Sequence, residues 1–142
     1  MASSILVVDD EQSMRDFMEI MLTKDGYTVA TASSGREAID KTKSEKFDLI
    51  IADLMMPEMA GMELLSEIKK VNPGQDFIVM TAFASVDTAI KAMKHGALDY
   101  VIKPFKIDEI KLVIEKSVSR KKLKTENEFL KKQLNPKGQK DL

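Results

Sequence analysis

The sequence reads DLIIAD over residues 48–53, a short apolar run that ends in a carboxylate. β-Branched and aliphatic residues without alternation are typical of a strand buried on both faces of a parallel sheet. Three further apolar runs also end at polar residues. Ile5–Val8 precedes Asp9 and Asp10, Phe77–Met80 precedes Thr81, and Tyr100–Ile102 precedes Lys103. Because the carboxyl ends of parallel strands open onto one crevice, we expect these polar side chains to converge with Asp53.

Segments with apolar residues at helical spacing lie between the apolar runs. The first predicted helix is Met14–Leu22, ended by Gly26, and the second is Ser34–Ser44, which a capping box of Ser34 and Glu37 begins. The third places Met62, Leu65 and Ile68 inward, and a weaker fourth, Ser85–His95, places Ala89, Ile90 and Met93 inward. Asp108 caps a last helix, whose apolar residues are Ile110, Val113, Ile114 and Val118. Tyr27–Thr31 is less apolar and is predicted as an edge strand.

Alternating strands and helices predict an α/β fold with one parallel sheet covered on both faces. The flavodoxin-like (α/β)5 order 2-1-3-4-5 fits best, because it places the two most continuous apolar strands, Ile5–Val8 and Asp48–Ala52, at the centre. This doubly wound order also makes these two strands neighbours. Asp9, Asp10 and Asp53 would then lie within reach of one ion.

Three converging carboxylates repel one another unless a cation neutralises them. Mg²⁺ prefers hard oxygen ligands and binds through one or two carboxylates together with phosphate oxygens. We expect Asp10 and Asp53 to bind the metal directly, with Asp9 acting through water. An aspartate carboxylate can attack phosphorus to form an aspartyl phosphate, and Lys103 would supply a compact positive charge for the phosphoryl oxygens.

Composition restricts the class of protein. A chain of 142 residues with 44% hydrophobic and 32% charged residues fits one globular domain, and the absence of cysteine excludes disulfides and thiolate metal sites. No signal peptide or membrane-length apolar run is present, so we expect a cytoplasmic protein without a membrane partner. Residues 120–142 carry eight basic and three acidic side chains. A basic tail can bind nucleic acid, but a solvated helix face explains Lys121, Lys122 and Lys124 better, and no direct DNA binding is expected.

The motifs together resemble the receiver domain of two-component response regulators. The stretches that carry the resemblance are LVVDDE (Leu6–Glu11), DLIIADLMMPEMAG (Asp48–Gly61), MTAFAS (Met80–Ser85) and DYVIKPF (Asp99–Phe105). The resemblance implies that Asp53 is the phosphoacceptor and that Asp10, Asp53 and the Met55 carbonyl bind Mg²⁺, with support from Asp9. It implies that Thr81 and Tyr100 are switch residues and that Lys103 contacts the phosphate. The same resemblance implies a cis peptide bond before Pro104. It also implies a signalling switch rather than a turnover enzyme, with a sensor histidine kinase as partner.

The stretch Thr81–Phe105 resembles the receivers of NtrC-like regulators, which activate the sigma-54 form of RNA polymerase. Those proteins carry AAA+ ATPase and DNA-binding output domains, for which this sequence shows no motif. We therefore expect a receiver domain over residues 1–119 and, over 120–142, an extended C-terminal helix that links to an output domain in a longer parent chain. A natural single-domain regulator is the alternative.

The tail has a short heptad pattern. Its seam residues are Leu123, Asn127, Leu130 and Leu134, spaced as in a parallel coiled coil with asparagine at an a position. A homodimer through this seam is expected. Two heptads are too few to be stable alone, so a frayed polar helix is the alternative.

Two other functions compete with the signalling switch. A haloacid-dehalogenase-like phosphatase also forms an aspartyl phosphate, but its nucleophile lies in a D-x-D motif after the first strand, where this chain has Asp9-Asp10. A flavodoxin-like FMN binder needs a Ser/Thr/Gly-rich phosphate loop at the same position, where this chain has Asp-Asp-Glu.

Overall fold

The computed structural model describes residues 3–56 and 58–119. Five parallel strands form one sheet in the order β2-β1-β3-β4-β5, which confirms the predicted topology. The strands are β1 (Ser4–Val8), β2 (Thr28–Ala32), β3 (Leu49–Asp53), β4 (Phe77–Thr81) and β5 (Asp99–Ile102). Their bounds differ by only one residue from the expected bounds at most ends. The seam residues Leu123, Asn127, Leu130 and Leu134 lie outside the described residues.

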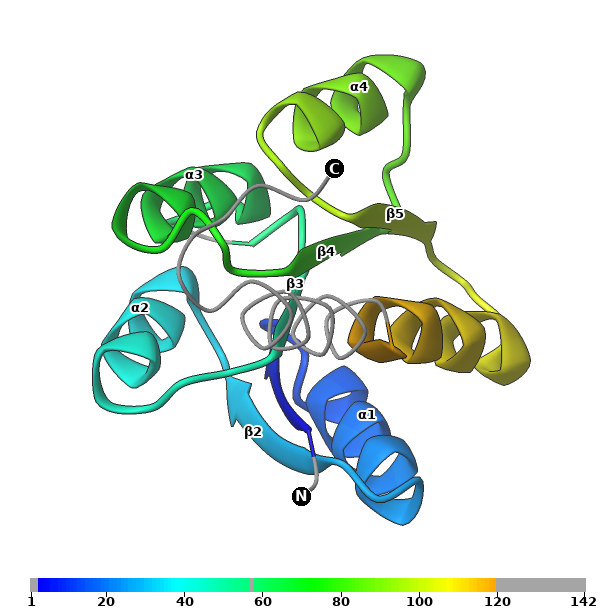
Figure 1. Ribbon diagram of the computed structural model, residues 1–142. Coiled ribbons are helices and arrows are strands. Elements are labelled where there is room, and N and C mark those ends of the chain that lie inside the picture. The colour runs from blue at the N-terminus through cyan, green and yellow to red at the C-terminus, as the bar shows by residue number, and fades with distance from the viewer. Residues whose placement is uncertain (1–2, 57, 120–142) are drawn as a thin grey trace, which may run out of the picture.

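Helices cover both faces of the sheet (Figure 1). They are α1 (Gln12–Lys24), α2 (Gly35–Ser44), α3 (Gly61–Val71), α4 (Val86–Lys94) and a further helix over residues 107–119. In Figure 1, α2, α3 and α4 lie on one side of the sheet, and α1 and the helix over 107–119 lie on the other. This arrangement is the doubly wound fold that the alternation of strands and helices predicts.

Alternate residues of each central strand enter two separate cores. Leu6 and Val8 of β1 pack in the core under α2 and α3, whereas Ile5 and Val7 pack in the core under α1 and the helix over 107–119. All four side chains are fully buried. Burial on both faces is why these strands are apolar without alternation.

The register of the central strands aligns their carboxyl ends. Val8 of β1 pairs with Ala52 of β3, so the next residues, Asp9 and Asp53, lie at the same level. On the other side of β3, Asp53 pairs with Met80, one residue before Thr81. Neighbouring strands therefore end together and present their next side chains at one edge.

Two local predictions were wrong in detail. The predicted inward set of α4 is not buried: Ile90 and Met93 are 48% and 49% exposed, and Ala92 is the residue of α4 that is buried. A short helix at the border of the sheet covers little surface, so its apolar stripe stays half in solvent.

The other local error concerns the capping box predicted for α2. The Ser34 side chain accepts from the Glu37 N–H as expected. The Glu37 carboxylate, however, accepts from the N–H of Ser33 at 2.6 Å, one residue before the cap. A reciprocal box does occur at α4, between Ser85 and Thr88, where the sequence analysis predicted only a helix start.

Candidate functional site: an acidic cluster bridged by Lys103

The same local turn orients a polar side chain at the end of three strands. The Asp9 carboxylate accepts from the Glu11 N–H, the Asp53 carboxylate from the Met55 N–H, and the Thr81 hydroxyl from the Phe83 N–H, each at 3.0 Å. Short polar side chains favour this bond to the amide two residues ahead. The turns therefore fix Oδ1 of Asp9 and of Asp53 and leave Oδ2 of each acid for other partners.

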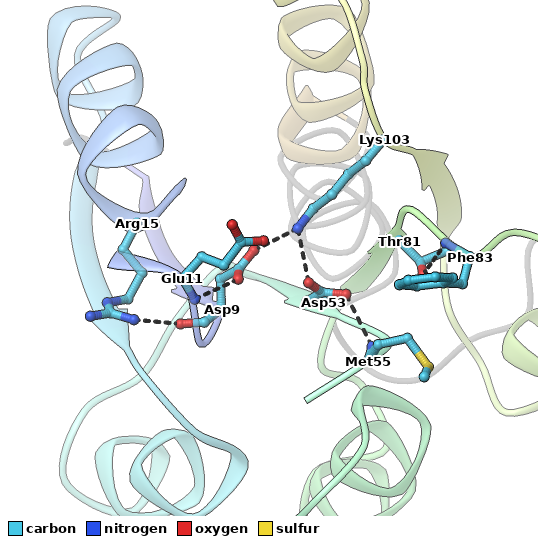
Figure 2. Close-up of polar contacts among 8 residues, drawn as sticks. All are labelled: Asp9, Glu11, Arg15, Asp53, Met55, Thr81, Phe83 and Lys103. Atoms are coloured by element: carbon cyan, nitrogen blue, oxygen red, sulfur yellow. Dashed lines mark hydrogen bonds and ion pairs between the residues drawn. The ribbon is translucent and has the colours of Figure 1, made fainter. Parts of the chain in front are cut away.

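Lys103 joins two of these strand ends. Its Nζ atom lies 2.8 Å from Asp9 Oδ2 and 2.8 Å from Asp53 Oδ2, and Figure 2 shows the ammonium between the two carboxylates. The Lys103 side chain is only 9% exposed, and both acids are buried. The sequence predicts that Lys103 contacts the phosphoryl oxygens, and the structure shows that its ammonium also lies beside the two acids and offsets their charge.

The environment of Lys103 favours its charged form. Burial disfavours the ammonium, but hydrogen bonds to Asp53 and Asp9 and the negative charges of both acids outweigh this effect and raise the pKa of Lys103 above 10.5. The lysine therefore remains protonated throughout the physiological range. The peptide bond that follows it, Lys103–Pro104, is cis.

The cluster offers oxygen ligands for a divalent cation. Asp9, Asp10 and Asp53 each offer one carboxylate oxygen, and these three atoms lie within 4.8 Å of one another. Asp10 is exposed, whereas Asp9 and Asp53 are buried. Clustered carboxylates of this kind suit a hard cation that retains part of its water shell.

Residues outside the predicted set also build the site. Arg15 of α1 donates from Nη1 to the Asp9 carbonyl oxygen at 2.7 Å and so holds the turn after β1 (Figure 2). Gly61, the first residue of α3, lies so close to β3 that a Cβ atom there would be 2.3 Å from the Asp53 carbonyl oxygen. No motif in the sequence pointed to a role for Arg15. Gly61 lies within the stretch that carries the resemblance, but only the fold explains why it is glycine.

The predicted switch residues occupy two different surroundings. Thr81 is fully buried at the end of β4. Tyr100 of β5 is half-buried and its hydroxyl lies 2.7 Å from Thr88 Oγ1 of α4. Two neighbours of the site are exposed instead: Met55 by 53% and Phe83 by 69%.

Comparison with known proteins is consistent with this geometry. Residues 5–115 match the family described as the response regulator receiver domain. The chain belongs to this family. The transcriptional regulatory protein ZraR of Klebsiella oxytoca is 44% identical over 119 residues, which are 84% of this chain and 27% of that protein. The regulatory protein AtoC of Escherichia coli K12 is 36% identical over 122 residues, or 86% of this chain and 26% of AtoC.

Solved receiver structures have the same fold. NtrX from Brucella abortus superposes with a TM-score of 0.85 at 34% identity, over 93% of this chain and 31% of NtrX. The response regulator TrrA from Thermotoga maritima, in complex with Mg(2+)-BeF, superposes with a TM-score of 0.74 at 36% identity, over 81% of this chain and 98% of TrrA.

The chain thus spans about a quarter of the length of the curated relatives it matches. As a receiver domain it is a signalling module with regulatory proteins among its relatives. Within residues 3–56 and 58–119, no helix is both long and apolar enough to cross a membrane.

Proposed function

We propose that this chain is a phosphorylation-activated switch in which Asp53 accepts a phosphoryl group from a sensor histidine kinase. The observation that carries the proposal is the bridge from Lys103 to Asp53 and Asp9, at 2.8 Å each, within the acidic cluster. A carboxylate beside a fixed ammonium and a metal-binding cluster has the charges that phosphoryl transfer requires. Membership of the receiver family supports this role.

Mg²⁺ is the cation proposed for the cluster. Asp10, Asp53 and the backbone carbonyl of Met55 would hold it directly, and Asp9 would act through a water molecule. The bound ion would neutralise negative charge on the phosphoryl oxygens. The TrrA structure, which contains Mg(2+)-BeF, supports this choice of ion for a protein of this fold.

In the transfer step, an oxygen of the Asp53 carboxylate forms a bond to phosphorus. The bond between phosphorus and the donor nitrogen of the kinase histidine breaks, and the electron pair stays on that nitrogen. Lys103 contacts the oxygens of the incoming group and so releases part of its interaction with Asp53. The chain would assist its own phosphorylation in this way. In dephosphorylation, water would attack phosphorus, the bond to the Asp53 oxygen would break, and inorganic phosphate would leave, so the chain turns over no separate substrate.

The phosphoryl group is proposed to act through Thr81 and Tyr100. The Thr81 hydroxyl accepts from the Phe83 N–H and keeps its own hydrogen for donation to a phosphoryl oxygen. Movement of Thr81 would vacate space for the Tyr100 ring. The surface formed by α4, β5 and the helix over 107–119 would change as a result, and a difference of a few kcal/mol suffices to invert such a population.

The changed surface is proposed to alter dimerisation and to control an output segment. In the structure described, the surface of α4, β5 and the helix over 107–119 exposes several large apolar side chains, namely Ile90, Met93, Ile102, Ile107 and Leu112. In a longer parent chain, AAA+ ATPase and DNA-binding domains would follow residue 142, as in NtrC-like activators of transcription. The names of ZraR and AtoC as regulatory proteins support this proposal.

Intact-mass measurement tests the phosphoacceptor. With Mg²⁺ and acetyl phosphate, the parent chain should gain one phosphoryl group, and Asp53→Asn should gain none. Asp40→Asn removes an exposed carboxylate of α2 and should behave as the parent. Equal phosphorylation of Asp53→Asn and the parent would show that another residue is the acceptor.

A further inference from the structure

Helix α4 is held to the sheet by few buried side chains. Ala92 is the residue of α4 that is buried, while the larger apolar residues Val86, Ile90 and Met93 are 75%, 48% and 49% exposed. Burial of large apolar side chains supplies most of the free energy that fixes a surface helix on a sheet. The individual polar contacts of α4 therefore matter more for its position than they do for α1 and α3, which bury several large apolar side chains.

One such contact joins α4 to β5. Thr88 Oγ1 lies 2.7 Å from the Tyr100 hydroxyl oxygen, and both residues are half-buried. This distance is that of a well-formed hydrogen bond between hydroxyl groups. The contact connects the residue proposed to respond to Asp53 with the first turn of α4.

Thr88 also belongs to the cap that begins α4. Its Oγ1 atom accepts from the Ser85 N–H at 3.1 Å, and it lies 2.9 Å from Ser85 Oγ and 3.1 Å from the Ser85 carbonyl oxygen. A hydroxyl group has one hydrogen and two acceptor positions, so it cannot satisfy four partners at once. The Tyr100 hydroxyl and Ser85 thus compete for hydrogen bonds to the Thr88 hydroxyl.

From these contacts we infer that Thr88 is the positioning residue through which Tyr100 and α4 move together. When Tyr100 changes its place, it must either carry the first turn of α4 along or release Thr88 to Ser85. Either outcome converts a movement of one ring into a change at the N-terminus of a loosely packed helix. This inference rests on the proposed function for the cause of the Tyr100 movement, but the link itself belongs to the described structure.

Amide hydrogen exchange tests the link without any phosphoryl donor. Tyr100→Phe removes the hydroxyl and should speed exchange of the α4 amides from Ala89 to Ala92 by about two- to tenfold, the range that one neutral hydrogen bond gives. In a Thr88→Val background, Tyr100→Phe should have no further effect, whereas in a Thr88→Ser background it should act as in the parent. No acceleration in the parent, or an equal acceleration in the Thr88→Val background, would overturn the inference.

Beryllofluoride with Mg²⁺ tests whether the link serves the switch. In the parent, NMR signals of residues 54–56 and of α4 should both shift. In Thr88→Val the shifts at 54–56 should remain while those of α4 fall at least twofold, and Thr88→Ser should match the parent. Undiminished α4 shifts in Thr88→Val would overturn the coupling role. Absence of any shift at 54–56 in the parent would instead contradict the proposed function, and hydrogen exchange would still decide the link.

Discussion

Lys103 has two roles, because its ammonium is the counter-ion of two buried carboxylates in the unphosphorylated domain and is also the proposed phosphate contact. Its Nζ lies between two buried carboxylates, Asp9 directly after β1 and Asp53 at the end of β3. Removing one partner of a buried ion pair leaves an uncompensated charge in a low-dielectric site. The same residue should therefore matter for stability and for phosphoryl acceptance.

Lys103→Gln is expected to lower the free energy of unfolding by about 3 kcal/mol at pH 7 and to abolish phosphorylation by acetyl phosphate. The pKa of Lys103 is raised in the folded chain. The stabilisation that Lys103 contributes to folding is therefore fully present below pH 10.5 and is lost as the pH rises through the raised pKa. Urea denaturation of parent and variant should show a constant difference from pH 7 to pH 9 that shrinks above pH 10.5.

Lys70→Gln is the matched control for this lysine. Lys70 forms an ion pair with Glu67 at 3.2 Å, but both side chains are largely exposed. Exposed pairs contribute little, so this variant should retain the stability of the parent within the error of denaturation. A Lys103→Gln variant as stable as Lys70→Gln would contradict the structural role of the bridge.

The elements around the site are placed by backbone contact as much as by side chains. Helix α3 begins against the carbonyl of Asp53, and its first amide, Gly61 N–H, donates to the Leu54 carbonyl oxygen at 2.9 Å. Any side chain at position 61 would push the helix away from β3. The start of α3 and the backbone at Asp53, the proposed phosphoacceptor, are therefore in direct contact and should move together.

Gly61→Ala is expected to destabilise the domain by about 2 kcal/mol, because the new Cβ would meet backbone atoms that cannot move freely. It should also slow phosphorylation by displacing Asp53. Gly74→Ala is the matched control, since the nearest atom to a Cβ there is Asn72 Oδ1 at 3.7 Å. Thermal unfolding and acetyl-phosphate kinetics of both variants would check this, and two equally stable variants would disprove it.

At the scale of elements, apolar continuity was enough to predict the sheet. The runs before Asp9 and Asp53 are buried on both faces, and such strands can occupy only central positions. Periodicity failed for α4, because Ile90 and Met93 lie on one helical stripe but no element among residues 3–56 and 58–119 covers that stripe. The depth to which a stripe is buried depends on its neighbours, and sequence spacing does not report them.

At the scale of the site, strand ends were predictable and the contacts between them were not. The position of Asp9, Asp53, Thr81 and Lys103 follows from the order of the strands. The bridge of Lys103 to both acids and the bond of Thr88 to Tyr100 depend on side-chain conformations in the folded state. Neither leaves a periodic signal in the sequence.

At the scale of the whole molecule, the proposed output is a change in self-association. The heptad residues Leu123, Asn127, Leu130 and Leu134 supply a candidate seam. Sedimentation at tens of micromolar should show that the sedimentation coefficient of the full chain depends on beryllofluoride with Mg²⁺. A truncation after Ser119 should lose the part of the association that the seam contributes. A full chain that is monomeric with and without beryllofluoride would exclude the seam.

The path of the chain through the site has a consequence for synthesis. Lys103 is 94 positions from Asp9 and 50 from Asp53, so the bridge forms only when β5 has joined β4. A nascent chain that still lacks residues 99–103 can present both acids but has no cation between them. If Asp53 is the phosphoacceptor that we propose, a chain without residues 99–103 would lack the ammonium proposed to contact the phosphoryl group and would be a poor phosphoacceptor.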